Sequence, residues 1–281
     1  GPVISAVIAE RFPETKGAML GQYSSATLIG RTVAPLAGGV IISSFVMYPG
    51  LIPYRMVYVA AALAAVPVLI MTVIYRESHQ ERPGLLPVSR FRSSFVSFFS
   101  HTGLRATAFV DMATYFSFGA FETFLPLFLA TRGIDPYLIG IIFAVQVLMI
   151  AGTKPFFGKL ADRFDKRVQI AAGLLILGSS VAIIPFTTGF STVLIVSAVF
   201  GLGMSLSTVA TSAYVADIAQ KEQIGASMGA LSSTMDIGHS AGPLVTGIVI
   251  ASLGYSYGFF ISFFLVVVVT AVFIVSVFDR A

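Results

Sequence analysis

The sequence predicts an all-α membrane protein with several transmembrane helices. Three observations support this prediction: 56% of the 281 residues are apolar, only 11% are charged, and the mean hydropathy is +0.91. A soluble domain is usually close to one quarter charged, so the solvent of this chain is predicted to be lipid. The apolar runs are continuous and do not alternate with polar residues, which favours helices over the strands of a barrel.

Eight apolar runs are long enough to span a membrane, because a helix needs about 20 apolar residues to cross the hydrocarbon layer. The predicted spans are residues 17–46, 55–75, 104–130, 136–156, 168–188, 192–218, 223–252 and 255–278. The first residues, Gly1–Ala9, are also apolar and are interpreted as the end of a ninth span whose beginning is absent. We therefore expect a multi-pass protein of the cell membrane, in contact with the lipid bilayer.

The basic residues predict how the spans are oriented. When alternate connections are assigned to the same side of the membrane, 14 of the 17 Lys and Arg residues fall on one side. The positive-inside rule predicts that this side is cytoplasmic, which places the long connection 76–103 and the C-terminus in the cytoplasm. The basic residues form no stripe interleaved with aromatic residues, so nucleic acid is not an expected partner.

Two spans repeat one another at an offset of 208 residues. Residues 17–42 and 225–250 share eleven identities over 26 positions without a gap. Six spans separate the two copies, an even number, so both copies cross the membrane in the same direction. Parallel repeats of this kind occur in transporters, and the offset predicts twelve spans arranged as six plus six. About three complete spans would then precede this chain.

This organisation divides the chain into three parts. Residues 1–75 are predicted to end an N-terminal six-helix half, and residues 76–103 to form a central cytoplasmic loop. Residues 104–281 are predicted to form the C-terminal six-helix half. In proteins built from such repeats, the substrate site lies near the middle of the bilayer, where the two halves meet.

Three motifs resemble those of the major facilitator superfamily. The stretch GKLADRFDKR (158–167) is similar to the cytoplasmic motif G-x-x-x-D-R-x-G-R-K of that family, with Asp165 in the place of a glycine. The stretches 9–21 and 216–229 resemble the connections that lead into the fifth and eleventh spans. A third motif resembles the antiporter motif of proton-coupled drug exporters, with Ala34 replacing a glycine. Its members are Gly21, Gly30, Pro35, Gly38 and Gly39.

The resemblance implies a major facilitator superfamily fold, of which this chain supplies part of the fourth span and the fifth to twelfth spans. It also implies a secondary active transporter that works by alternating access, in the branch that exchanges drugs for protons. The expected partners are a small-molecule substrate and protons, and the complete protein is expected to be a monomer. We expect no cofactor, no metal and no catalytic residue.

The glycine-rich spans and the cytoplasmic motif each have two interpretations. Small residues on one helix face allow close packing in a membrane, and Pro35 could in addition form a sealed hinge against a neighbouring span. The corresponding positions of the second copy are Gly229, Gly238, Gly242, Pro243 and Gly247. In the cytoplasmic motif, Gly158 is expected to end a span, and Asp162 to cap a helix or to pair with Arg163 or Arg167. The motif, which includes Lys166, acts either as a latch between the halves or as an anchor that fixes orientation.

Five ionisable residues lie away from the ends of predicted spans: Arg31, Asp111, Glu122, Asp236 and His239. A charge at the bilayer centre costs about 2.5–3.5 kcal/mol on insertion scales, so such residues usually serve a pathway or a partner. Asp236 and His239 are three residues apart and share a helix face. Arg31 stands at the repeat position equivalent to His239. We predict proton or substrate roles for these residues, with structural pairing as the alternative and, for Asp111, a solvated or helix-capping position.

Glu122 is flanked by phenylalanines in FSFGAFETFLPLFL, an environment that suits a flat or lipophilic cation. The leading hypothesis is therefore proton-coupled efflux of amphipathic compounds. One alternative is an uptake symporter or facilitator for a sugar or another metabolite, although the chain has no Trp for a sugar site. Another is a truncated homologue that does not transport. An enzyme is not expected, because the sequence has no cysteine and no His-Glu-x-x-His, Gly-x-Ser-x-Gly or phosphate-loop motif.

Overall fold

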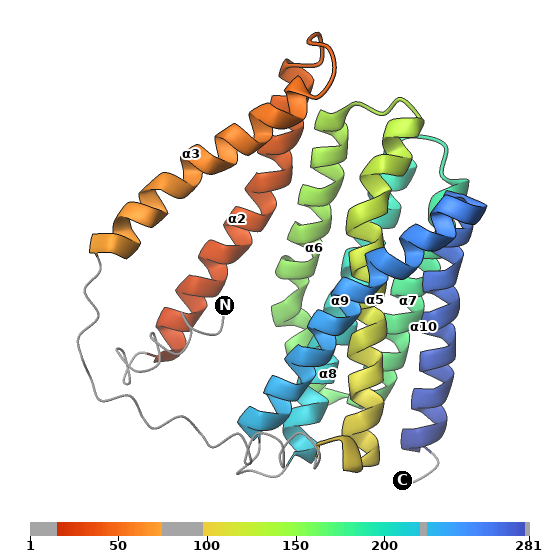
Figure 1. Cartoon of the computed structure of the whole chain (residues 1–281). Coiled ribbons are helices and arrows are strands. Elements are labelled where there is room, and N and C mark those ends of the chain that lie inside the picture. Colours follow the sequence, from red (N-terminus) through yellow and green to blue (C-terminus); the bar gives the residue numbers. More distant parts are fainter. Residues whose placement is uncertain (1–15, 75–97, 220–223, 279–281) are drawn as a thin grey trace.

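The computed structural model describes residues 16–74, 98–219 and 224–278. Within these ranges the secondary structure is entirely helical, as predicted. The elements are α2 (Lys16–Ser44), α3 (Ile52–Ile74), α5 (Thr102–Thr131), α6 (Pro136–Arg163), α7 (Lys166–Ile183), the short 3₁₀ helix η1 (Ile184–Phe186), α8 (Phe190–Ile218), α9 (Ile224–Leu253) and α10 (Tyr255–Phe278). Figure 1 shows them as a bundle of long, roughly antiparallel helices.

Each of the eight apolar runs forms a helix close to its predicted range, which confirms the all-α membrane fold. By length and composition, six described helices can cross a membrane: α3, α5, α6, α7 with η1, α8 and α10. Helices α2 and α9 are not among the six, although they are 29 and 30 residues long. In α2 the apolar stretch Ile29–Ser44 is shorter than a full span, and α9 carries Asp236 and His239, which lower its hydropathy. The expected remnant Gly1–Ala9 lies outside the described residues.

One helix differs from its predicted range: α6 continues to Arg163, whereas the sequence predicted an end at residue 156. Gly158 therefore lies inside a helix and does not end the span. The chain leaves the helix at Phe164, and Asp165 then caps α7 by accepting a hydrogen bond from the Arg167 amide. The correction has a simple reason, since one glycine near the end of a long helix costs only about 1 kcal/mol and does not stop it.

Helices α5 to α10 pack into one bundle with a continuous aromatic and aliphatic core. Phe121 of α5 and Phe200 of α8 stack at its centre, with ring centroids 4.2 Å apart. Helices α2 and α3 form a separate pair at one side of the bundle (Figure 1). Of this pair, α2 contacts α6, whereas the side chains of α3 are almost all exposed.

Helices α5 and α9 approach very closely, because two glycines of α9 lie against the backbone of α5. The Cα of Gly238 faces the carbonyl oxygen of Met112, and that of Gly242 faces the carbonyl oxygen of Phe116. A side chain at either position would collide with the α5 backbone. Both glycines belong to the second copy of the repeated motif, and here they fix the spacing between two helices that carry ionisable residues.

Candidate functional site

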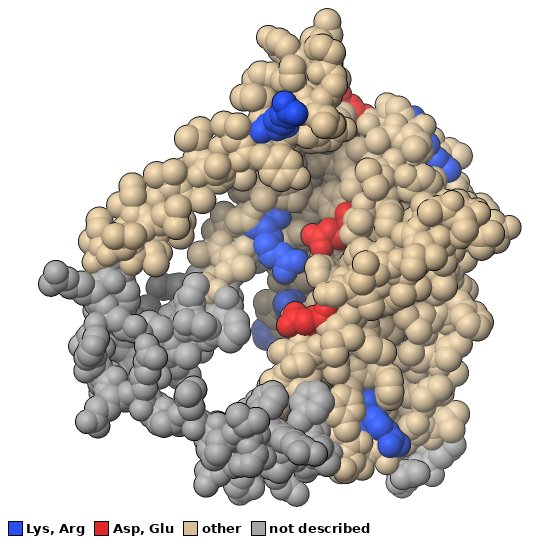
Figure 2. All heavy atoms as spheres, viewed as in Figure 1, with Lys and Arg blue, Asp and Glu red and all other residues tan. Residues whose placement is uncertain are grey.

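Four of the five predicted ionisable residues have exposed side chains in the region between α2 and the bundle: Arg31, Glu122, Asp236 and His239. Figure 2 shows basic and acidic side chains facing one another across a hollow between the α2–α3 pair and the rest of the molecule. Arg31 comes from α2, Glu122 from α5, and Asp236 and His239 from α9. Three helices that are distant in sequence thus contribute charged groups to one region.

Glu122 and His239 form a direct pair across the α5–α9 contact. The His239 Nε2 lies 3.2 Å from the Glu122 Oε2, and the two side chains are 46% and 48% exposed, respectively. The close approach of the helices makes this pairing possible, because Gly119, one turn before Glu122, lies against the His239 carbonyl oxygen. The pair is therefore held by the backbone and yet is open to the hollow.

Phe118 joins α2 to the Glu122–His239 pair. The His239 ring stacks on the Phe118 ring at a centroid distance of 5.5 Å and an interplanar angle of 26°. The Arg31 guanidinium carbon lies 5.9 Å from the centroid of the same ring, within the range of a cation–π contact. Of the phenylalanines that flank Glu122 in the sequence, Phe118 is the one that contacts both His239 and Arg31.

Asp111 differs from its predicted position. It is 5% exposed and lies within α5, whose N-cap is His101, so it neither faces solvent nor caps the helix. Among the residues that the structure describes, Asp111 has no hydrogen bond or ion pair. Tyr115, one turn after Asp111 on α5, lies within electrostatic range of Asp111, Arg31 and Asp236.

Two residues of this environment were not predicted from the sequence. Tyr115 lies one turn after Asp111 on α5, and Lys154 of α6 interacts electrostatically with Arg31. The sequence analysis counted Lys154, two residues before the predicted end of the span 136–156, with the basic residues of the cytoplasmic side. In the structure Lys154 lies within α6, in electrostatic range of Arg31, and its place inside the predicted span was the available signal.

The glycine-rich motif of α2 makes its contact through Pro35 and Gly39. A Cβ built on Gly39 would lie 2.6 Å from the Pro136 carbonyl oxygen, and one built on Gly140 would lie 2.6 Å from the Pro35 carbonyl oxygen. Gly30 and Gly38, which were expected to pack closely, have no described atom within 4 Å of such a Cβ. The surroundings of Gly21 are not among the described side chains.

The second copy of the motif makes its contacts on a different face. Gly238 and Gly242 contact α5, as described above, and Pro243 lies against Gly119 of the same helix. A Cβ built on Gly247 would lie 3.1 Å from the Phe124 ring. Gly229 has no described neighbour within 4 Å. The repeated sequence therefore serves two helix contacts in this structure, α2 with α6 and α9 with α5.

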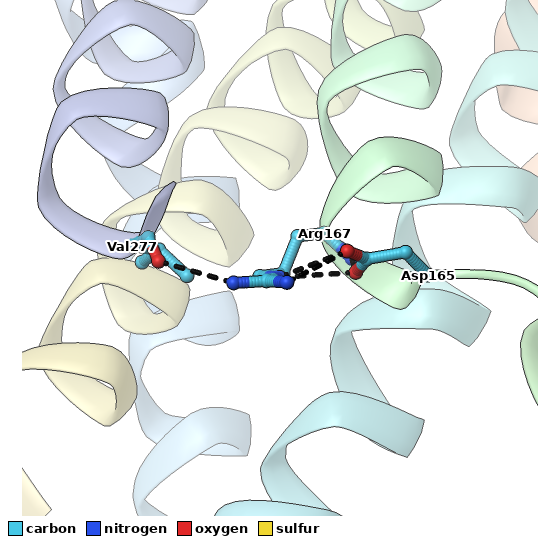
Figure 3. Close-up of polar contacts among 3 residues, drawn as sticks. All are labelled: Asp165, Arg167 and Val277. Atoms are coloured by element: carbon cyan, nitrogen blue, oxygen red, sulfur yellow. Dashed lines mark hydrogen bonds and ion pairs between the residues drawn. The ribbon is translucent and has the colours of Figure 1, made fainter. Parts of the chain in front are cut away.

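The motif at residues 158–167 forms two ion pairs with described residues, Arg167 with Asp165 inside the motif and Lys166 with Asp217 outside it, and neither involves Asp162. Arg167 bonds both carboxylate oxygens of Asp165 and also donates to the Val277 carbonyl oxygen at the end of α10 (Figure 3). Lys166 pairs with Asp217 of α8 at 2.7 Å. Asp162 and Arg163 are exposed at the end of α6, and neither has an ion pair with a described residue. The motif thus ties the start of α7 to α8 and α10.

The arrangement combines a titratable pair, a fixed cation and an aromatic ring beside a hollow. An imidazole changes its charge near neutral pH, and a carboxylate can hold either a proton or an organic cation. In the described part of the chain, no group of three His, Cys, Asp or Glu side chains could hold a metal ion. Carboxylate, imidazole and guanidinium groups inside membrane proteins commonly bind protons or charged molecules reversibly.

Comparison with known proteins shows which family the fold and sequence resemble. The sequence profile of the family described as Major Facilitator Superfamily matches residues 1–135 and, separately, residues 107–281. An uncharacterized MFS-type transporter of Methanocaldococcus jannaschii is 23% identical over 255 residues, which cover 90% of this chain and 64% of the relative. Multidrug resistance protein 2 of Bacillus subtilis is 30% identical over 154 residues, 54% of this chain and 38% of that protein. This chain therefore spans less than two thirds of the length of these relatives.

Among solved structures, the chain is similar to a bacterial homolog of the human lysosomal transporter Spinster, whose crystal structure is in an inward-facing and unoccupied conformation. The TM-score is 0.79 with 15% sequence identity, and the match covers 98% of this chain and 74% of the other. At this identity the similarity concerns the fold. It extends over α2, α3 and the bundle together.

Proposed function

Because this chain belongs to the Major Facilitator Superfamily, we propose that the protein exports small amphipathic compounds across the cell membrane in exchange for protons. The observation that carries the proposal is the Glu122–His239 pair, which is exposed to the hollow between α2 and the bundle. Inside a membrane, ionisable groups are rare and usually line a substrate or proton pathway. A relative of this chain from Bacillus subtilis is named a multidrug resistance protein, which supports the efflux direction.

The way in which α2 meets the bundle supports a mechanism of alternating access. Its contacts with α6 lie at Pro35, Gly39 and Ser43, near the C-terminal end of α2. Towards its N-terminal end, α2 diverges from α6 (Figure 1). We assign α2 and α3 to the first six-helix half, and we assign the divergent end, where the basic connections cluster, to the cytoplasmic side. Substrate would then enter from the cytoplasm and leave after α2 and α6 part at the other end.

Within the hollow, each residue has a proposed role. Glu122 and Asp236 bind the proton or the positive charge of the substrate, and Phe118 provides an aromatic surface beside Glu122. Arg31 is a permanent cation, so it offsets part of the negative charge of the two carboxylates when they are ionised. Asp111, which is buried beneath this layer, is a further proton site that substrate does not reach.

The test uses the protein in its full natural length, reconstituted in proteoliposomes with an imposed pH gradient. Gradient-driven transport of tetraphenylphosphonium, a lipophilic cation, is expected in the wild type and is expected to fall to the level of empty liposomes in Glu122→Gln or Asp236→Asn. An uncoupler that collapses the gradient should have the same effect on the wild type. Asp217→Asn is the matched control, because it also removes one carboxylate but from an exposed ion pair at the end of α8. Unchanged gradient-driven transport in both Glu122→Gln and Asp236→Asn would contradict the proposal.

A further inference from the structure

His239 lies where it can control access to Glu122. Resting on the proposed function, we propose that a proton on His239 and a monovalent lipophilic cation compete for the Glu122 carboxylate, so that His239 is the residue that couples the proton to the substrate. The competition requires three features: a contact that protonation strengthens, a surface that the imidazole covers, and surroundings that admit one positive charge at a time.

The contact itself is a hydrogen bond whose strength depends on the charge of the imidazole. The His239 Nε2 and the Glu122 Oε2 are 3.2 Å apart. When the carboxylate is ionised it can only accept, so Nε2–H is then the donor. A bond between an imidazolium and a carboxylate is roughly twice as strong as one between neutral groups. Protonation of His239 therefore tightens its hold on Glu122, and loss of the proton leaves a weaker bond that an organic cation can replace.

The imidazole also covers the aromatic surface that such a cation needs. The His239 ring is stacked on Phe118 at 5.5 Å, so any movement of His239 away from Glu122 uncovers the Phe118 ring beside a free carboxylate. A carboxylate next to an aromatic ring is a typical binding site for a quaternary or delocalised cation. The same movement thus creates both parts of the site, and the return of a protonated His239 removes both.

The other charged groups around His239 favour a single positive charge. Arg31 of α2 approaches the same Phe118 ring, and Lys154 of α6 lies within electrostatic range of Arg31. On the acidic side are Asp236 of α9 and, deeper in α5, Asp111 with Tyr115. In the described residues, α8 and α10 make no hydrogen bond, ion pair or ring contact with His239. With Arg31 fixed beside the site, a proton on His239 and a bound cation would repel each other, which makes their occupancy mutually exclusive.

The experiment measures how pH changes the affinity of the purified full-length protein for tetraphenylphosphonium. Wild type is expected to bind about tenfold more weakly at pH 5.5 than at pH 7.5, as competition with a proton on an imidazole requires. His239→Gln and His239→Asn keep a polar donor but carry no imidazole, so both should lose most of the tenfold pH dependence, and what remains should come from protons bound by Glu122 and Asp236. His101→Asn is the matched control: it replaces the N-cap histidine of α5 with another good capping residue and should keep the tenfold dependence.

The outcomes separate this inference from the proposed function. If either His239 variant folds and still binds about tenfold more weakly at pH 5.5, the inference is overturned, while proton-driven transport by the wild type would leave the proposed function standing. If wild type binds no tetraphenylphosphonium and shows no gradient-driven transport, the proposed function itself fails. Loss of most of the pH dependence in both His239 variants, together with its retention in His101→Asn, is the expected result.

Discussion

Ser43 and Asp135 join α2 to the first turn of α6. The Ser43 hydroxyl donates to the Asp135 carboxylate at 2.7 Å, and the Tyr137 amide donates to the same carboxylate oxygen at 2.7 Å and to the hydroxyl at 3.1 Å. One turn before Ser43, Gly39 of α2 lies against the backbone of α6, and Gly140 of α6 lies against the backbone of α2. Polar and steric contacts therefore coincide at one end of the α2–α6 pair, and the hollow with the ionisable residues lies beside the other end.

The glycine at position 39 is predicted to be essential for this contact, whereas its neighbour is not. A methyl group on Gly39 would lie 2.6 Å from the Pro136 carbonyl oxygen, so Gly39→Ala should force the helices apart and lower the free energy of unfolding by about 1–3 kcal/mol. Gly38→Ala has open space, and in a helix it should raise that free energy by about 0.5–1 kcal/mol. Thermal unfolding of the two variants in the same detergent tests the difference in sign. Equal destabilisation by both variants would show that α2 does not pack on α6 through Gly39.

The Ser43–Asp135 bond is predicted to be coupled to the cap of α6. Ser43→Ala removes the hydroxyl that donates to Asp135 and accepts from the Tyr137 amide, and because both bonds are exposed it should cost about 0.5–1.5 kcal/mol of stability. Asp135→Ala removes this bond and also the N-cap, so it should cost about 1 kcal/mol more, whereas Asp135→Asn keeps an acceptor for both. A double-mutant cycle with Ser43→Ala and Asp135→Ala measures the coupling energy. Strictly additive effects of the two substitutions would mean that the hydroxyl and the carboxylate do not interact.

The positions of the helices could be predicted from the sequence because the physics is local. A backbone in lipid must satisfy its own hydrogen bonds, so an apolar run of sufficient length forms a helix whatever surrounds it. The ranges of α5, α8 and α10 accordingly agree with the predicted spans to within a few residues. The end of α6 was missed because the sequence marked where the apolar run stops, and a helix can continue beyond its membrane segment.

The site could be predicted only in part, since its geometry depends on which helix faces meet. The sequence identified Glu122 and His239 as ionisable residues inside predicted spans. They are 117 positions apart, and nothing in the sequence around either residue indicates that they form a pair. Likewise, Gly38 and Gly39 are equivalent as small residues, and only the rotation of α2 against α6 decides which of them makes the contact. Asp165 was treated as a departure from a motif, whereas in the folded chain it both caps α7 and binds Arg167.

The pair of Asp165 and Arg167 predicts a specific response to acid. Hydrogen bonds from the Arg167 side chain lower the pKa of the Asp165 carboxyl below its ordinary value. A carboxyl with a lowered pKa in the folded state stabilises the fold above the unfolded pKa of about 3.9, and this contribution is lost as the pH falls through the lower, folded value. Asp165→Asn keeps an acceptor for the α7 cap but cannot titrate, so its stability should fall less steeply than that of wild type when the pH is lowered from 5 to 3. Arg167→Lys should give an intermediate slope, because an ammonium is a point charge that cannot bind both oxygens side by side. Thermal unfolding across this pH range measures the slopes, and identical slopes in wild type and Asp165→Asn would rule out a contribution from the pair.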